Sequence, residues 1–394
     1  MAAPELHLTA DDAPFGVAVS GGADSLSVLL SCKLHNLRVR AATVDHGLRP
    51  ASAAEAATVG TLCAARGIPH DTLPLSLSDG ADLQARARDA RYAALADWAR
   101  WRGVRSVLLG HTADDVAETL LMRLNDGAGL NGLSAMAPRF SRFGVTFLRP
   151  FHTLRRNCLR DFVLAQGVTP IDDPSNENPR FERVRVRQLI RDLGLPVDQL
   201  AASARALSEV RTSVEAQTLR LATAYVSEDR GDLLIKPHDL AALLGDAEQA
   251  RRVLLRALSW INGGTYPPRR AEQVELMRRV AAGEDATLAG CLLRHRATGL
   301  RIAREPAAAL RARDAVPGTV WDGRWRVTAR GGDLSGLSIR ALGGAVTDVD
   351  WRAIGLPRSS VMARPAIWRG AALLAVPGLS EGWRADCEPV WPEG

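Results

Sequence analysis

The first half of the chain alternates short apolar runs with longer segments of helical periodicity. The apolar runs predict buried strands at residues 15–19, 39–44, 68–75 and 106–109. Helices are predicted at residues 52–66, where Ser52 and Glu55 match a capping box, and at residues 83–102. Strands that alternate with helices indicate an α/β fold with a doubly wound, mainly parallel sheet. In such sheets, ligands bind beyond the carboxyl ends of the strands.

The second half of the chain has a different pattern. Residues 197–228 are alanine-rich with helical spacing, and helices at 247–260 and 270–282 precede a hairpin-like stretch at 286–305. From residue 306 the chain is rich in Gly, Pro and Trp, with short strands predicted at 325–329, 337–341 and 371–376. We therefore expect a catalytic domain (1–195), a helical linker (196–228), a mixed α/β domain (229–305) and a small β-rich C-terminal module (306–394).

The first predicted strand leads into a glycine turn suited to binding phosphate. The turn reads Ser20, Gly21, Gly22, Ala23, Asp24 and Ser25, and an apolar helical run follows it. Glycines let backbone N–H groups approach an anion, and the helix N-terminus adds partial positive charge. No lysine follows the glycines, so this is neither a G-x-x-x-x-G-K-[ST] loop nor a G-x-G-x-x-G motif. The alternative is a plain turn with Asp24 as helix N-cap; the full motif after a strand favours the phosphate loop.

Two more polar clusters follow predicted strand ends. Asp45 and His46 follow the second strand, and residues 110–115 follow the strand at 106–109. Three polar clusters at one sheet edge favour a ligand site over three unrelated turns. Two alternatives stay open: Asp45 and His46 could simply terminate a strand, and His111 could be a packed strand-end histidine rather than a donor of a hydrogen bond or proton.

Composition narrows the classes of protein that fit. With 394 residues, 46% hydrophobic and 24% charged, the chain suits two or three globular domains. No apolar run could span a bilayer and no signal peptide is indicated, so a cytoplasmic protein without membrane contact is expected. The net charge of +6 is compatible with a polyanionic partner, and all basic residues but Lys33 and Lys236 are arginines. The five cysteines are scattered without C-x-x-C spacing, which fits free thiols.

The motifs taken together resemble the tRNA(Ile)-lysidine synthetase family of the PP-loop ATP pyrophosphatases. Besides residues 20–25, the motifs in family order are Asp45-His46-Gly47-Leu48-Arg49, Arg88 to Tyr92, Gly110 to Thr119, the glycine loop at 127–136, and Asp173 to Asn176 leading to Phe181 and Arg183. The resemblance is strong over residues 15–195. Two departures are Ala135 and Val184, where the family usually has glycine and asparagine.

The resemblance implies a two-step reaction. ATP adenylates the C2 oxygen of the wobble cytidine in isoleucine tRNA with a CAU anticodon, and the ε-amine of lysine then displaces AMP. ATP and Mg²⁺ are thus expected as cofactors, and this tRNA and lysine as partners; the oligomeric state stays open, a dimer being one option. Alternatives are a tRNA thiolation enzyme, an amidotransferase synthetase or a non-catalytic RNA-binding module. Scattered thiols weigh against sulfur transfer, and the retained carboxylates weigh against a non-catalytic module.

The resemblance also implies roles for single residues. The catalytic set is Asp24, His111, Asp115 and Glu118, with Asp24 also serving Mg²⁺. The expected ATP contacts are the loop residues Ser20, Gly21, Gly22, Ala23, Asp24 and Ser25, together with Asp45, His46 and Arg88. The expected tRNA contacts are Arg91, Arg183, Arg185 and Arg187, although arginines on a helix are more often a solvated face. Residues 229–394 are expected to bind tRNA rather than perform chemistry.

Asp115 and Glu118 are expected to hold the lysine substrate. A spacing of three on a helix places both carboxylates on one face, where they suit an ammonium group. Spacing alone also allows Asp114 with Glu118, and the resemblance favours Asp115. The alternative is an ordinary acidic first turn stabilised by the helix dipole.

Overall fold

The computed structural model describes residues 2–45, 47, 52–75, 83–134, 136–172, 178–264, 268–329, 334–388 and 391–392. The motif residues His46, Leu48, Arg49, Ala135, Asp173, Pro174, Ser175 and Asn176 lie outside this set. The chain forms two compact units, Met1–Thr212 and Ser213–Gly394. The finer division expected from the sequence, with boundaries near residues 195, 228 and 305, stays a prediction.

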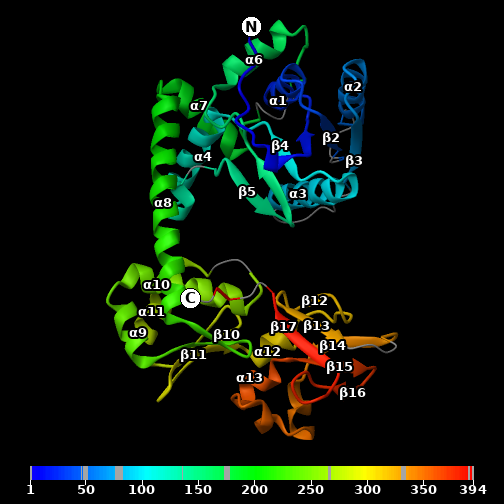
Figure 1. The fold of residues 1–394 in the computed structure, drawn as a ribbon. Coiled ribbons are helices and arrows are strands. Elements are labelled where there is room, and N and C mark those ends of the chain that lie inside the picture. The colour runs from blue at the N-terminus through cyan, green and yellow to red at the C-terminus, as the bar shows by residue number, and fades with distance from the viewer. Residues whose placement is uncertain are drawn as a thin grey trace. The chain divides into compact units, whose positions relative to one another are not determined.

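The first unit is built on one six-stranded sheet (Figure 1). Its strand order is β3-β2-β1-β4-β6-β5, and every pairing is parallel except that of β5 with β6. The strands are β1 (Phe15–Ala18), β2 (Val39–Asp45), β3 (His70–Pro74), β4 (Ser106–Leu109), β5 (Arg139–Arg142) and β6 (Val145–Leu148). β1 and β4 are buried along their whole length, which explains why they read as continuous apolar runs.

Helices cover both faces of this sheet. Side chains of α1, α2 and α6 join one apolar cluster with β1, while α3 packs in a second cluster that contains Phe147 of β6. The doubly wound α/β fold predicted from the sequence is therefore confirmed. The helices of this unit are α1 (Ala23–Leu34), α2 (Ser52–Ala65), α3 (Leu83–Arg102), α4 (Ala113–Asn125), α5 (Leu130–Leu133), α6 (Arg156–Ala165), α7 (Glu182–Asp192) and α8 (Val197–Tyr225), which continues into the second unit.

The carboxyl ends of β1 and β4 bring two turns together. α1 begins at Ala23 after β1, and α4 begins at Ala113 after β4. A Cβ atom on Gly110 would lie only 2.5 Å from the backbone carbonyl carbon of Asp24. Because only glycine fits this close approach, the turn after β4 can lie directly against the first turn of α1.

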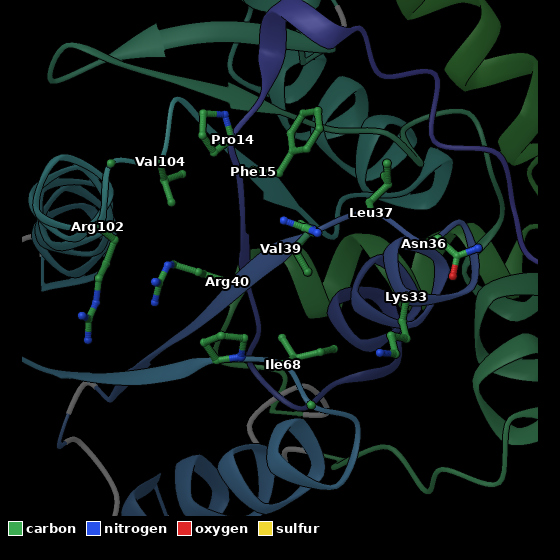
Figure 2. A pocket seen from close by; sticks show the side chains of 14 residues that line it. Pro14, Phe15, Lys33, Asn36, Leu37, Val39, Arg40, Ile68, Arg102 and Val104 are labelled. Atoms are coloured by element: carbon green, nitrogen blue, oxygen red, sulfur yellow. The ribbon is translucent and has the colours of Figure 1, made fainter.

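The opposite, amino-terminal edge of the sheet holds a pocket of about 570 Å³ (Figure 2). Its lining includes Lys33, Arg38, Arg40 and Arg102. Lys33 and Arg102 lie in the last turns of α1 and α3, where cations stabilise the partially negative helix C-terminus. Nε of Arg102 also donates to Asp71 Oδ2 at 3.0 Å. We therefore assign these two cations a structural role.

The second unit is mixed, with antiparallel sheets. A five-stranded sheet has the order β7-β8-β11-β10-β9, and two three-stranded sheets have the orders β12-β13-β17 and β14-β15-β16. The strands are β7 (Ser227–Asp229), β8 (Asp232–Ile235), β9 (Ala286–Leu288), β10 (Cys291–Arg296), β11 (Gly299–Arg304), β12 (Val320–Trp321), β13 (Trp325–Ala329), β14 (Leu337–Ala341), β15 (Pro365–Arg369), β16 (Ala372–Ala375) and β17 (Trp383–Cys387). The helices are α9 (Pro237–Leu244), α10 (Ala247–Ile261), α11 (Arg270–Ala281), α12 (Pro306–Ala309) and α13 (Arg358–Met362).

Buried polar contacts tie the sheets of the second unit together. Arg324 is 3% exposed and donates to the carbonyl of Gly231 at 2.6 Å, while Ser360 Oγ donates to Asp232 Oδ2, also at 2.6 Å. The strands predicted at 325–329 and 337–341 are β13 and β14, residue for residue. Within the described ranges, no helix is long and apolar enough to cross a membrane.

Candidate active site

The phosphate-loop motif lies between β1 and α1 and is held in shape by its own serines. Ser25 Oγ accepts a hydrogen bond from the Ser20 N–H at 3.1 Å and donates to the Gly22 carbonyl at 3.0 Å. Gly21 has a φ of +87°, which favours glycine. Gly22 is the N-cap of α1, so the alternative of Asp24 as N-cap is wrong. The first-turn N–H groups of α1 are therefore available to an anion.

The carboxylate of Asp24 carries an unsatisfied oxygen. Its Oδ2 accepts from Nε of Arg156 at 3.1 Å, whereas its Oδ1 is buried without a hydrogen-bond partner. Burial raises the pKa of Asp24 to about 6, although the charge of Arg156 opposes this rise. An unpartnered carboxylate oxygen beside a phosphate loop fits Mg²⁺, a hard ion that prefers oxygen ligands.

The side chains that the structure describes do not complete a metal site by themselves. Among the residues that the structure describes, no group of three or more His, Cys, Asp or Glu side chains could hold a metal ion. Mg²⁺ commonly binds through one or two carboxylates together with substrate phosphates and water. Asp24 therefore fits a magnesium ion that arrives with a nucleotide.

The two carboxylates predicted to share a face of α4 do so. Thr112 caps this helix: Oδ2 of Asp115 accepts from the Thr112 N–H at 2.9 Å and from its hydroxyl at 2.8 Å. Oδ1 of Asp115 therefore remains to face outward from the cap, toward Arg156 at 2.9 Å. The Glu118 side chain, only 1% exposed, faces the same guanidinium, with Oε1 at 3.0 Å.

Asp114 points elsewhere, toward the start of α6. Its Oδ2 accepts from the Arg156 N–H at 2.8 Å and from Nε of Arg155 at 3.3 Å. A carboxylate that satisfies a first-turn N–H group stabilises a helix N-terminus. This contact accounts for the start of α6 at Arg156 and engages the Asp114 carboxylate there.

Arg156 is the central side chain that sequence reasoning missed. Its three nitrogens reach Asp24, Asp115 and Glu118. Burial alone would lower the pKa of Arg156, but these carboxylates together raise it. Burial would likewise raise the pKa of Asp115, yet Arg156, His111 and Arg183 lower it, so Asp115 stays ionised. Arg156 and Asp24 are 132 positions apart in the sequence, so local residue spacing could not indicate that they are in contact.

His111 lies beside a second basic residue that the sequence did not reveal. Nε of Arg149, which is 5% exposed, donates to His111 Nδ1 at 3.3 Å. Burial lowers the pKa of His111 to about 3; Arg149, Arg91 and Arg88 add to this effect, and Asp115 opposes it. His111 is therefore neutral near pH 7, and with Nδ1 as acceptor its hydrogen is on Nε2.

The predicted arginine contacts divide into two groups. Arg187 Nε donates to Glu118 Oε1 at 2.9 Å, and Arg183 Nη2 donates to Thr119 Oγ1 at 3.2 Å. Arg185 is exposed and donates to the carbonyls of Pro179 and Arg180, both at 3.1 Å. The structure thus brings Arg183 and Arg187 to the carboxylates of α4 and leaves Arg185 on the surface.

The remaining predicted contacts lie around the same sheet edge. Arg88 is exposed, with its guanidinium carbon 5.6 Å from the ring centre of Tyr92. Burial lowers the pKa of Arg91. Asp45 ends β2 and accepts the Gly47 N–H at 2.9 Å.

A phosphate loop without lysine, followed across the sheet edge by an acidic helix, defines a PP-loop protein. In agreement, a family model described as a PP-loop domain matches residues 4–193. The tRNA(Ile)-lysidine synthase of Ruegeria pomeroyi is 41% identical, with 95% of this chain and 91% of that relative covered. The enzyme of the same name from Novosphingobium aromaticivorans is 43% identical (74% and 88% covered), and that from Mesorhizobium japonicum 37% (91% and 83%). The chain belongs to the tRNA(Ile)-lysidine synthase family, which confirms the resemblance seen in its motifs.

Proposed function

We propose that this chain is a ligase that forms lysidine in isoleucine tRNA with a CAU anticodon. ATP adenylates the C2 oxygen of the wobble cytidine and releases pyrophosphate. The ε-amine of lysine then attacks C2, forming the carbon–nitrogen bond as AMP leaves. Adenylation converts a poor oxygen leaving group into a good one, which is why the reaction needs ATP.

One geometric observation carries this proposal. Asp24 of the phosphate loop and the Asp115–Glu118 pair of α4 are close enough for a single guanidinium to contact all three. A site for the leaving pyrophosphate therefore adjoins a site suited to an ammonium group. Two-step transfer needs this adjacency because the amine must attack the carbon that the nucleotide has activated.

On the nucleotide side, the loop residues bind the phosphates. Backbone N–H groups at the start of α1 and the hydroxyls of Ser20 and Ser25 donate to phosphate oxygens. Asp24 is the protein ligand of Mg²⁺, which when bound neutralises charge that develops on the departing pyrophosphate. Arg88 and the end of β2, with Asp45 and His46, complete the ATP contacts.

On the lysine side, Asp115 and Glu118 hold the ε-ammonium, and one of them accepts the proton that the amine must lose before attack. Asp115 presents Oδ1 for this purpose, because its Oδ2 is engaged by the Thr112 cap. His111 acts as a neutral hydrogen-bond donor through Nε2, stabilising charge on the reacting groups rather than titrating near neutral pH.

The tRNA contacts come from arginines of α3 and α7 and from the second unit. Arg185 and Arg91 contact phosphates, while Arg183 and Arg187 support the α4 carboxylates next to the bound cytidine. Residues 229–394 bind the body of the tRNA, since all recognised motifs lie before residue 195.

Sulfur transfer is the alternative within this fold, and the buried cysteines Cys32 and Cys63 do not suit it. Burial raises the pKa of the Cys32 thiol to about 12 and that of the Cys63 thiol to about 11. Neither thiol is therefore ionised near pH 7, and the thiolate is the form that reacts.

The proposal is tested with purified protein, ATP, Mg²⁺, bulk tRNA and lysine. The expected result is AMP release that requires both tRNA and lysine, with lysine recovered covalently in the tRNA. AMP release that does not depend on lysine, or that requires a sulfur donor instead, would overturn the proposal.

A further inference from the structure

The proposed lysine site is already filled by a side chain of the protein. Nη1 of Arg156 lies 3.0 Å from Glu118 Oε1, Nη2 lies 2.9 Å from Asp115 Oδ1, and Nε lies 3.1 Å from Asp24 Oδ2. A guanidinium in this position makes the charge-assisted contacts that an ε-ammonium would make. Lysine and Arg156 therefore cannot hold these oxygens at the same time.

The charges of this cluster are also balanced. The three carboxylates face an equal number of guanidinium groups, because Arg183 and Arg187 of α7 join Arg156. Arg187 Nε lies 2.9 Å from Glu118 Oε1, and Arg183 Nε lies 3.5 Å from Glu118 Oε2. A cluster without net charge gives an additional cation little electrostatic gain. A free ammonium can bind here only when one of these guanidinium groups moves away.

Arg156 differs from the two arginines of α7 in its reach. Within the described residues, the ion pairs and side-chain hydrogen bonds of Arg183 and Arg187 go to α4, whereas Arg156 also contacts Asp24 of the phosphate loop. Resting on the proposed function, we propose that Arg156 is a cationic place-holder that occupies the lysine site until nucleotide draws Asp24 away, so that lysine binds after ATP. Occupation of the loop removes one of the three partners of Arg156 and weakens its hold on the other two.

This order of binding has a chemical consequence. If lysine enters only after the nucleotide has bound, it reaches a site in which the cytidine can be activated. Until then, Arg156 keeps the buried carboxylates of the empty enzyme paired. Arg156 acts through Asp24, Asp115 and Glu118 and is thus a positioning residue.

The test is equilibrium dialysis of labelled lysine against the full-length protein, with and without Mg²⁺ and a non-hydrolysable ATP analogue. Wild-type protein is expected to bind lysine weakly without nucleotide and at least about tenfold more tightly with it. While Arg156 occupies the site, the apparent affinity for lysine is reduced in proportion to the fraction of molecules in which the site is open. Arg156→Met should bind lysine without nucleotide as tightly as wild-type protein does with it, and should gain nothing further from nucleotide.

Arg160→Met is the matched control on the same helix. Arg160 pairs with Asp172 through contacts of 2.7 and 2.8 Å on the surface, away from the three carboxylates. It should behave like wild type. If Arg156→Met does not fold, Arg156→Lys carries the test: a shorter, single-point cation cannot hold three carboxylates, so nucleotide-free lysine binding should be intermediate.

The results that would overturn the place-holder role differ from those that would overturn the proposed function. Weaker lysine binding by Arg156→Met with and without nucleotide would make Arg156 a permanent part of the lysine site and would overturn the place-holder role alone. Equal lysine binding by wild-type protein with and without nucleotide would also overturn the place-holder role alone. Absence of lysine binding by wild-type protein even with nucleotide and tRNA would overturn the proposed function, and this inference with it.

Discussion

Replacing Asp24 by asparagine should weaken Mg²⁺ binding without preventing the protein from folding. The substitution keeps the size of the side chain and removes its charge. Because Oδ1 of Asp24 is buried without a partner, the carboxylate has an unfilled coordination position. Loss of its charge should weaken Mg²⁺ binding in the nucleotide complex and slow adenylation.

The magnitude follows from the ionisation of the group. With the pKa of Asp24 near 6, the carboxylate is about 90% ionised at pH 7 and about 10% ionised at pH 5. The apparent affinity for Mg²⁺ should therefore fall roughly tenfold between these pH values in wild-type protein, in proportion to the fraction of molecules with an ionised Asp24.

The assay is titration of Mg²⁺ into the protein with a bound ATP analogue, at both pH values. Protonation of the nucleotide phosphates also weakens Mg²⁺ binding in this range, and Asp24→Asn shares this contribution, so it serves as the control. The difference between the two proteins isolates Asp24. An asparagine variant with wild-type Mg²⁺ affinity at pH 7 and the same pH dependence would refute the assignment.

The same variant should be more stable when empty. The pKa of Asp24 is about 6 in the folded protein, against 3.8 for an unperturbed aspartate carboxyl, so the folded state binds this proton more tightly than the unfolded state. The stability contributed by the group accordingly falls as the pH rises from about 4 to about 6. At pH 7 the ionised carboxylate costs up to about 3 kcal/mol, at about 1.4 kcal/mol per pKa unit. Asp24→Asn should recover part of this in a thermal unfolding experiment.

Three further outcomes are expected. In ¹⁵N NMR spectra, His111 should carry its hydrogen on Nε2 and show no titration between pH 5 and 8, because its pKa lies near 3; a titration near pH 6.5 would contradict the neutral-donor role. Arg185→Gln should reduce the slope of log Kd for tRNA against log salt concentration by about 0.7–0.9. Arg187→Gln should instead leave the slope unchanged, since Arg187 faces Glu118; equal slopes for wild type and Arg185→Gln would exclude a phosphate contact.

The sheet and the position of the site could be predicted because both depend on local pattern. Continuous apolar runs marked β1 and β4, and the polar residues after them had to meet at one edge of a parallel sheet. The start of α6 could not be predicted from local pattern, because it depends on Asp114, a residue distant in sequence that accepts the Arg156 N–H.

The partners of the site's arginines were not predictable in the same way. Arg156 and Arg149 sit in segments without a recognised motif, and their contacts arise only when distant strands and helices pack. The division of the α7 arginines did have a local signal: residues 183 and 187 are four apart and share a helix face, whereas residue 185 lies on the other side. The tRNA contacts of these three arginines stay a prediction.

The central claim is that nucleotide and lysine use adjoining but separate groups, and Glu118→Gln tests it most directly. The two half-reactions can be followed separately: transfer of labelled AMP to tRNA without lysine, then its displacement when lysine is added. Asp126→Asn is the control, because Asp126 lies at the end of the same helix in an exposed pair with Arg123, where ion pairs contribute little. Thermal unfolding verifies that each variant is folded.

Glu118→Gln is expected to adenylate tRNA at close to the wild-type rate and to need far more lysine to complete the reaction, while Asp126→Asn is expected to be unchanged in both steps. Equal loss of adenylation and of lysine transfer in a folded Glu118→Gln protein would show that lysine is not held at this pair of carboxylates.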